Sequence, residues 1–184
     1  MILRTFARGL FRKNRVLKLE PVDVAVCIDI ECTCDSPVQM SPMEVIELAC
    51  LKLDLNEIPP PPKTISSDGI STIPSTLNKC PTFHSFVKPV INPELTLFCQ
   101  ELTGVLQSTV DKAETIDKVI DKLFKWLQDE KLIDNNNTMM RQFAFASCGN
   151  FDLNLLSPIV SSHKFKNNLE LPIYFREWIN VKKT

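Results

Sequence analysis

The sequence lacks a long apolar segment and a complete zinc-binding motif, and each absence excludes a class of protein. No stretch approaches the ~18 uninterrupted apolar residues that a transmembrane helix needs, which excludes a membrane-spanning protein. The seven cysteines show no repeated spacing, and only Cys32 and Cys34 form a close pair. With only two histidines in the chain to complete the ligand set, a tetrahedral zinc site is not expected.

An apolar signal-peptide core is also absent, and together with the odd number of cysteines this favours a reducing, intracellular compartment. Residues 1–20 form a basic leader, because the first 19 positions hold six basic side chains and no acidic one. Its apolar residues recur at roughly helical spacing, which is typical of a mitochondrial presequence. The alternatives are a disordered arm or a basic strip that contacts RNA backbone, in a cytoplasmic or nuclear protein.

The remainder of the chain, 21–184, has the length of one domain with a hydrophobic core. It is acidic: six of the 21 basic residues and one of the 22 acidic residues, Glu20, lie in the leader, so 15 basic residues stand against 21 acidic ones. An acidic domain argues against nucleic-acid binding that depends mainly on phosphate neutralisation by lysine and arginine. If this protein binds nucleic acid, metal ions must supply part of the neutralising charge.

Hydrophobic periodicity predicts a mixed α/β domain. Four segments are rich in β-branched or alternating apolar residues and are predicted to be strands: 22–30, 45–55, 82–87 and 143–147. Apolar spacing and helix-start signals predict helices at 94–102, at 116–127 and from about residue 152. The tail at 173–181 is mixed, and both helix and strand fit it.

A polar, proline-rich loop is expected at 56–79, where the periodicity disappears. Its prolines at Pro59–Pro62 favour the extended polyproline conformation that SH3- and WW-type domains bind. The alternative is a stiff surface loop that has no partner.

Two carboxylates, Asp29 and Glu31, end the first predicted strand. Side chains two residues apart point to the same face of a strand, so both carboxylates converge at the edge of an apolar sheet. Their repulsion and desolvation are costly unless a cation neutralises them, and Mg²⁺ or Mn²⁺ prefers such oxygen ligands. The alternative is that polar residues simply terminate the strand.

A third carboxylate, Asp152, follows another short apolar strand and a glycine-containing turn. It can therefore reach the same place as Asp29 and Glu31 from a distant segment of the chain. Three acids suit a pair of metal ions ~3.5 to 4 Å apart, which clamp the attacking and leaving oxygens of a phosphodiester.

Five short segments resemble the DEDDh 3′-to-5′ exonucleases in order and in spacing. They are C-I-D-I-E-C-T-C at 27–34, E-V-I-E-L-A at 44–49, F-H-S-F-V-K-P at 83–89, L-T-G-V at 102–105 and C-G-N-F-D-L at 148–153. The chain most resembles the Eri-type exoribonucleases, the group that includes the 3′ histone-mRNA exonuclease. The segment P-I-Y-F-R-E-W-I-N-V-K-K at 172–183 resembles theirs too, so the match covers about residues 22–183.

The resemblance implies an RNase H-like fold, in which helices flank a mixed β-sheet. It also implies metal-dependent hydrolysis of phosphodiester bonds from the 3′ end of RNA. Asp29 would bridge two Mg²⁺ or Mn²⁺ ions, Glu31 would bind one of them, and Asp152 would bind the other.

The same resemblance assigns substrate contacts to Glu31, Cys32, Thr33, Leu102 and Thr103. The backbone from Glu31 to Thr33 would hold the terminal 3′-hydroxyl, and Leu102 would wedge against the last bases. For Leu102, ordinary packing at a helix end is the alternative. The sequence alone does not distinguish RNA from DNA as the substrate, because residues that recognise the 2′-hydroxyl cannot be identified from one sequence.

The family's third motif, H-x-x-x-x-D, does not occur in the 184 residues, and His163 has Asn168 at the corresponding offset. The resemblance assigns the general base and the last metal ligand to that motif, and a positioned base is worth roughly 10² to 10⁴ in rate. Two expectations follow. The domain is incomplete at its C-terminus because the sequence is part of a longer product, or the chain is a shortened relative that binds RNA or acts as a scaffold without efficient cleavage.

Overall fold

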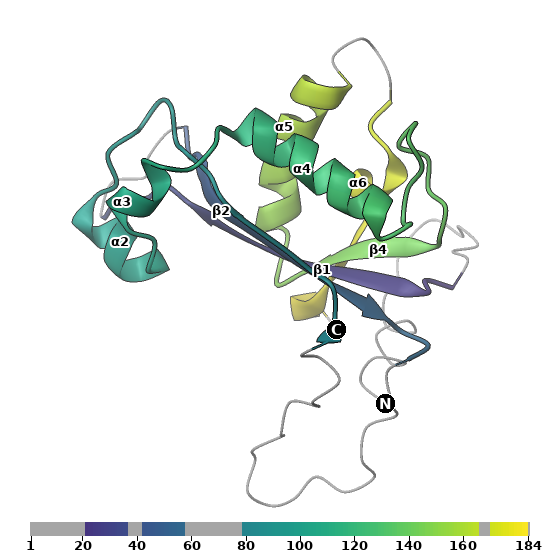
Figure 1. Ribbon diagram of the computed structural model, residues 1–184. Coiled ribbons are helices and arrows are strands. Elements are labelled where there is room, and N and C mark those ends of the chain that lie inside the picture. The colour runs from purple at the N-terminus through teal and green to yellow at the C-terminus, as the bar shows by residue number, and fades with distance from the viewer. Residues whose placement is uncertain (1–20, 37–41, 58–78, 166–169, 184) are drawn as a thin grey trace, which may run out of the picture.

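The computed structural model describes residues 21–36, 42–57, 79–165 and 170–183, which form a five-stranded sheet with helices packed against it (Figure 1). The strands are β1 (Val24–Cys32), β2 (Val45–Asp54), β3 (Thr82–Phe86), β4 (Phe143–Ser147) and β5 (Trp178–Asn180). Their order in the sheet is β3-β2-β1-β4-β5. Since β1 pairs antiparallel with β2 and parallel with β4, the sheet is mixed and β1 is its central strand.

The two faces of β1 lie in different environments. Successive side chains of a strand alternate between faces, so Val26, Ile28 and Ile30 share one face, and all three are buried. The side chains of Asp29 and Glu31 lie on the other face, where Asp29 is exposed and Glu31 is half-buried. One strand therefore supplies both core residues and charged surface residues.

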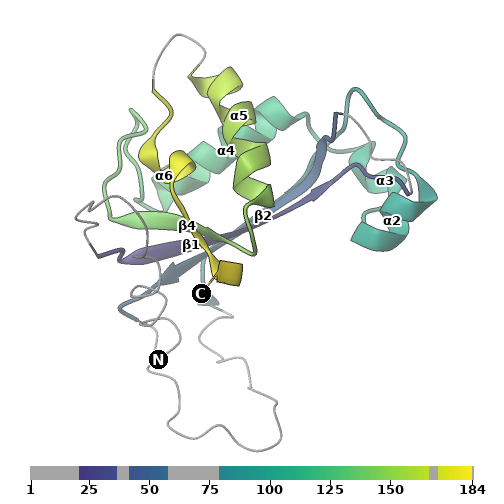
Figure 2. The same cartoon turned by 180° about the vertical axis from the view of Figure 1, so that it is seen from behind.

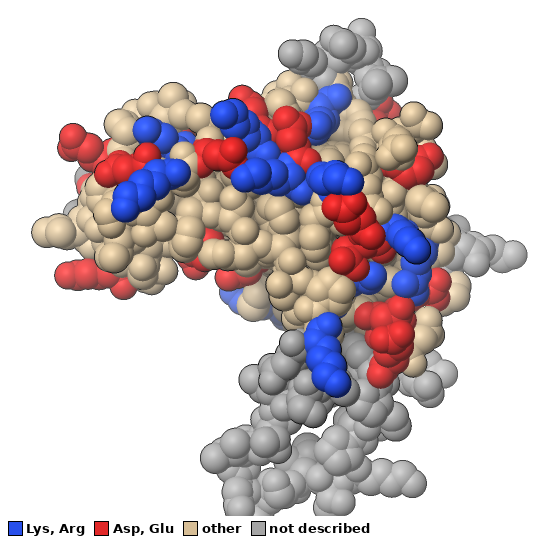
Figure 3. All heavy atoms as spheres, in the orientation of Figure 1, with Lys and Arg blue, Asp and Glu red and all other residues tan. Residues whose placement is uncertain are grey.

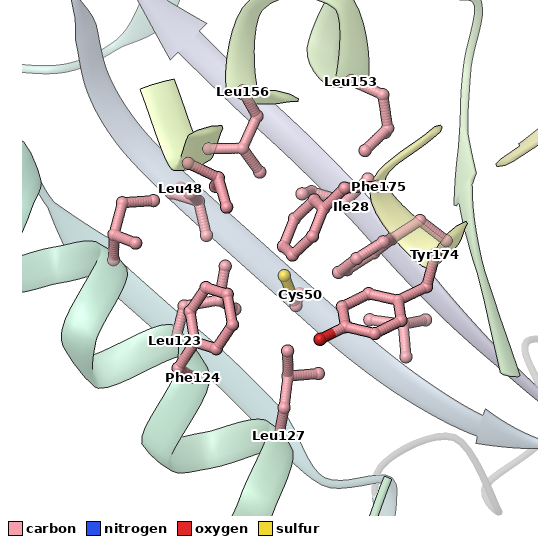
Figure 4. Packing of buried hydrophobic residues seen from close by; sticks show 14 of the residues in the cluster. Ile28, Leu48, Cys50, Leu123, Phe124, Leu127, Leu153, Leu156, Tyr174 and Phe175 are labelled. Atoms are coloured by element: carbon pink, nitrogen blue, oxygen red, sulfur yellow. The ribbon is translucent and has the colours of Figure 1, made fainter. Parts of the chain in front are cut away.

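Three helices cover the apolar face of the sheet: α4 (Ile116–Asp129), α5 (Phe151–Lys164) and the short α6 (Ile173–Arg176) (Figures 1 and 2). Figure 4 shows their side chains converging on the strands. The labelled residues are Leu123, Phe124 and Leu127 of α4, Leu153 and Leu156 of α5, Tyr174 and Phe175 of α6, and Ile28, Leu48 and Cys50 of the sheet. Burial of one apolar helix face against a sheet contributes most of the stability of such helices.

A second, smaller cluster lies at the end of β1 that carries Glu31, under α2 (Leu97–Thr103) and α3 (Gln107–Val110) (Figure 1). Its buried members are Ile46, Leu95, Cys99, Val105 and Val110. The hydroxyl of Thr96 accepts a 3.0 Å hydrogen bond from the Cys99 N–H and caps the start of α2. A helix of seven residues is marginal by itself, so α2 depends on its tertiary contacts.

The predicted mixed α/β class is confirmed, and so are the strands predicted at 45–55, 82–87 and 143–147 and the helix predicted at 116–127, each within two residues. β1 is displaced from its predicted bounds and runs to Cys32. Asp29 and Glu31 therefore lie inside the strand, and the alternative that they terminate it is wrong.

Two further segments differ from the expectation. The helix predicted from residue 94 begins at Leu97 because Thr96, not Pro93, provides the cap. The tail contains both a helical turn, α6, and a strand, β5, which pairs parallel with β4. The sequence of the tail alone did not determine this arrangement, because β5 is a strand only through its hydrogen bonds to β4.

The basic leader at 1–20 lies outside the described residues, and so do Pro59–Pro62 and most of the proline-rich loop predicted at 56–79. Within the described part of the chain, no helix has both the length and the apolar character required to cross a lipid bilayer.

Leu123 of α4 tests the described core. Its side chain is fully buried, so Leu123→Ala should lower the free energy of unfolding by about 2 to 5 kcal/mol, through lost burial and the cavity that remains. Leu97→Ala is the matched control, because that side chain is 78% exposed and its loss should cost less than about 0.5 kcal/mol. Urea denaturation measures both values, and equal losses would contradict the packing described.

Candidate active site

Asp29 and Glu31 lie on the face of the sheet opposite the helices. Asp29 is paired across the sheet with Ala49 of β2, which is paired in turn with His84 of β3. Glu31 is paired with Glu47 of β2. The small side chain of Ala49 leaves the space beside Asp29 open, and a shallow depression is present there.

Asp152 lies in the first turn of α5 and is buried, with 7% of its surface exposed. β4 ends at Ser147, and a turn containing Gly149 at φ 122° leads the chain into α5. The Ser147 hydroxyl donates a hydrogen bond to Oδ2 of Asp152. Because β4 is parallel to β1, the start of α5 lies at the same end of the sheet as Asp29 and Glu31.

The two acids on β1 are perturbed by their surroundings. Asp29 is exposed as a residue, but partial burial of its carboxyl group raises the pKa of Asp29, and the negative charges of Asp152 and Glu47 raise it further. Burial also raises the pKa of Glu31, followed by the charges of Asp29, Glu47 and Asp152. Nearby negative charge raises the pKa of a carboxyl group because it disfavours the ionised form. The fold therefore brings the three acids within electrostatic reach of each other.

Glu47 is a fourth acidic group beside Asp29 and Glu31, and it was not predicted to be a site residue. Its Oε1 lies 2.5 Å from Nε2 of His84, whose ring contacts the Phe86 ring edge-on with centroids 4.8 Å apart. The segment E-V-I-E-L-A at 44–49 contains Glu47, so a signal was present in the sequence. Only the register of β2 against β1, however, places Glu47 opposite Glu31.

Two residues predicted to contact substrate, Cys32 and Thr33, are buried at the end of β1. The Thr33 N–H donates a 2.8 Å hydrogen bond to the Glu44 carbonyl, and Thr33 Oγ1 accepts a 2.9 Å bond from the Glu44 N–H. Burial, and then the charge of Glu31, raises the pKa of the Cys32 thiol to about 12, so this thiol is protonated at neutral pH. The side chains of Cys32 and Thr33 are therefore packed inside the protein.

Leu102 of α2 is 66% exposed, so the alternative of ordinary core packing for this residue is wrong. Leu97 and Phe98 on the same short helix are also exposed, at 78% and 39%. Thr103 is half-buried, and its hydroxyl donates a 2.7 Å hydrogen bond to the Cys99 carbonyl. The helix thus presents apolar side chains to solvent at the end of the sheet that carries Glu31.

The donor chemistry of Asp29, Glu31 and Asp152 suits a hard divalent cation, because carboxylate oxygens are the ligands that such ions prefer. A cation would also offset the mutual repulsion that raises the pKa values of Asp29 and Glu31. Among the described residues, no three His, Cys, Asp or Glu side chains are already gathered closely enough to hold a metal ion. The three acids have the ligand chemistry of a divalent-metal site, but their side chains do not form a complete coordination shell.

Charges of both signs alternate on the face that Figure 3 shows. Over α3 and α4 the basic side chains are interspersed with acidic ones, as in the ion pairs Lys122–Glu114 and Lys125–Asp129. No continuous basic surface is visible among the described residues of this face.

A family model described as Exonuclease (RNase_T) matches residues 26–184. The chain belongs to the RNase_T exonuclease family. Among its relatives, ERI1 exoribonuclease 3 of Homo sapiens is 35% identical over 158 residues, which are 85% of this chain and 38% of that protein.

Solved structures of RNase_T-like nucleases are similar to the whole described fold. Cell-death related nuclease 4 (CRN-4) superposes with a TM-score of 0.64 at 28% identity, over 89% of this chain and 46% of that one. The nuclease domain of 3′hExo, a DEDDh family member whose structure is bound to rAMP, superposes with a TM-score of 0.63 at 26% identity, over 88% and 68% of the two chains.

These similarities confirm the predicted DEDDh resemblance and the RNase H-like fold. DEDDh exonucleases of this family generally depend on divalent metal ions. The chain spans less than half the length of two of these relatives, 38% of ERI1 exoribonuclease 3 and 46% of CRN-4.

The raised pKa of Asp29 predicts that ionised Asp29 destabilises the metal-free fold, and that this destabilisation grows as pH rises through the raised pKa. Asp29→Asn should therefore raise the melting temperature at pH 7 in EDTA. Asp29 is solvent-exposed, so screening limits the expected gain to about 1 to 3 °C. The gain should shrink as pH falls towards 4, where the unaltered carboxyl group becomes protonated.

Asp23→Asn, at the residue before β1, is the matched control and should leave the melting temperature unchanged at pH 7 and at pH 4. Thermal denaturation followed by circular dichroism at a series of pH values gives the melting temperatures of the unaltered chain and of both variants. A lower melting temperature for Asp29→Asn at pH 7 would show that the carboxylates do not repel one another as described.

Proposed function

We propose that this chain carries the metal-binding half of a 3′-to-5′ exoribonuclease active site, with Asp29, Glu31 and Asp152 as the metal ligands. The observation that supports this most is that acids from β1, β2 and the start of α5 approach one another at one end of the sheet, where burial and then like charge raise the pKa of Asp29 and of Glu31. Repulsion of this kind costs stability and is characteristic of functional sites. A scaffold protein has no physical need for converging acids.

In this proposal Asp29 would help to hold both of two Mg²⁺ or Mn²⁺ ions, Glu31 would hold one of them, and Asp152 would hold the other. Such ions, when bound, neutralise phosphodiester charge and activate water. The protein's own contribution is to orient the ligands. Ser147 holds one oxygen of Asp152 by its hydroxyl, and His84 holds the carboxylate of Glu47 beside Glu31.

The proposed substrate is the 3′ end of RNA. The backbone from Glu31 to Thr33 would contact the terminal 3′-hydroxyl, and the exposed side chain of Leu102, next to Thr103, would contact the terminal bases. An apolar surface suits this role because every nucleobase has a face that packs on it. RNA is favoured over DNA because a relative is named an exoribonuclease and another was solved with rAMP.

A rival proposal is a relative that binds RNA without cleaving it, since the H-x-x-x-x-D motif does not occur in these 184 residues. The relatives reported above are named as nucleases, which favours the enzyme. The two proposals differ in one measurable property, namely whether bound RNA becomes shorter.

The purified chain, with Mg²⁺ or Mn²⁺, should shorten a 5′-labelled single-stranded RNA in steps from its 3′ end. Asp29→Asn should abolish the shortening because it removes the proposed bridging ligand, whereas Asp23→Asn should not. A denaturing gel resolves the ladder of products. A matched DNA oligonucleotide tests the choice of nucleic acid, and EDTA tests the need for a metal ion.

Metal-dependent RNA binding without shortening would support the rival proposal. Shortening that persists in EDTA or in Asp29→Asn would rule out the proposed metal ligands.

A further inference from the structure

Glu44, the residue before β2, has a carboxylate engaged by three consecutive backbone amides. Oε1 accepts hydrogen bonds from the N–H groups of Val90 (2.7 Å) and Ile91 (3.0 Å). Oε2 accepts from Ile91 (3.0 Å) and from Asn92 (2.6 Å). Successive amides that converge on one carboxylate form a charge-assisted anion-binding loop, and such bonds are stronger than neutral ones.

The backbone of Glu44 is bonded to the other side of the candidate site. Its N–H donates to Thr33 Oγ1 at 2.9 Å, and its carbonyl accepts from the Thr33 N–H at 2.8 Å. One residue therefore connects the turn at the end of β1 to the segment 90–92. That segment leads directly into α2, which carries the exposed Leu102.

Two more hydrogen bonds connect the end of β1 to α2 and its cap. The Thr96 hydroxyl donates to the Cys34 carbonyl at 2.8 Å, and the Cys99 thiol donates to the Cys32 carbonyl at 3.5 Å. Both run from α2, or its cap, to the backbone at the end of β1. The Glu44 carboxylate is the only charged group among these connections.

From this geometry we infer that Glu44 is a positioning residue, which sets the separation between the segment Glu31–Thr33 at the end of β1 and the Leu102 surface of α2. The inference rests on the proposed function, in which these two parts hold the same terminal nucleotide. Cys99 is the one buried residue of α2 in the small apolar cluster, so hydrogen bonds add to limited packing in fixing the position of this short helix. Misplacement of one contact surface weakens substrate binding even when every contacting residue is intact.

Glu44→Gln tests the inference, because an amide keeps the size of the side chain but loses the charge and one acceptor oxygen. We expect its dissociation constant for a 5′-fluorescein single-stranded RNA to rise roughly five- to tenfold, as for the loss of charge-assisted hydrogen bonds. A 3′-terminal phosphorothioate in the RNA slows hydrolysis during the anisotropy measurement in Mg²⁺. Affinity for Mn²⁺ alone, from electron paramagnetic resonance, should stay within about twofold, because the metal ligands are untouched.

A double-mutant cycle with Leu102→Ala separates positioning from general stabilisation. If Glu44 acts through the Leu102 surface, Glu44→Gln should weaken RNA binding by less than about twofold in the Leu102→Ala background. A purely structural role would give the same loss in both backgrounds. Glu57→Gln removes the same charge from an exposed turn at the other end of β2 and should bind RNA as the unaltered chain does.

An unchanged RNA affinity of Glu44→Gln, equal losses in both backgrounds, or a parallel loss of Mn²⁺ affinity would each overturn the positioning role while leaving the proposed function standing. If the unaltered chain bound no RNA in Mg²⁺, the proposed function would fail, and the positioning role with it.

Discussion

Repulsion between carboxylates at one end of a central strand is the constraint on which the rest of this structure depends. Asp29 and Glu31 share a face of β1, Asp152 approaches from the start of α5, and Glu47 faces Glu31 across the sheet. Burial and like charge both raise the pKa of the acids on β1. Because ionised acids at this end of the sheet destabilise the fold, other interactions must supply the compensating stability. The same negative charge favours the binding of a divalent cation there.

The compensating stability comes from the opposite face of the same strand. Val26, Ile28 and Ile30 pack beneath α4, α5 and α6, and this contiguous core anchors β1 up to the register shift between Glu31 and Cys32. Because the core fixes the strand, the carboxylates cannot relax by moving apart along the backbone. The Ser147 hydroxyl, bonded to Asp152, holds the third acid in the same way from β4. The rigid apolar layer is thus what keeps the acids together.

The surface proposed to hold the terminal nucleotide is built differently. Leu102 projects from a seven-residue helix, and hydrogen bonds from Glu44, Thr96 and Cys99 connect that helix to the end of β1. Polar connections are directional, so they fix a position more sharply than apolar contact does. Apolar packing is the main support of the acids on β1, and directional hydrogen bonds supplement a small apolar cluster in supporting α2.

Local periodicity in the sequence was enough to determine β2, β3, β4 and α4 within two residues, and the alternation of side chains along a strand was enough to put Asp29 and Glu31 on one face. The exposure of Leu102 and the position of Glu47 opposite Glu31 were decided only by the tertiary structure. The first depends on which side of α2 packs against the rest of the chain, and the second depends on the register of β2 against β1. Register is a relation between strands, so no single stretch of sequence contains it.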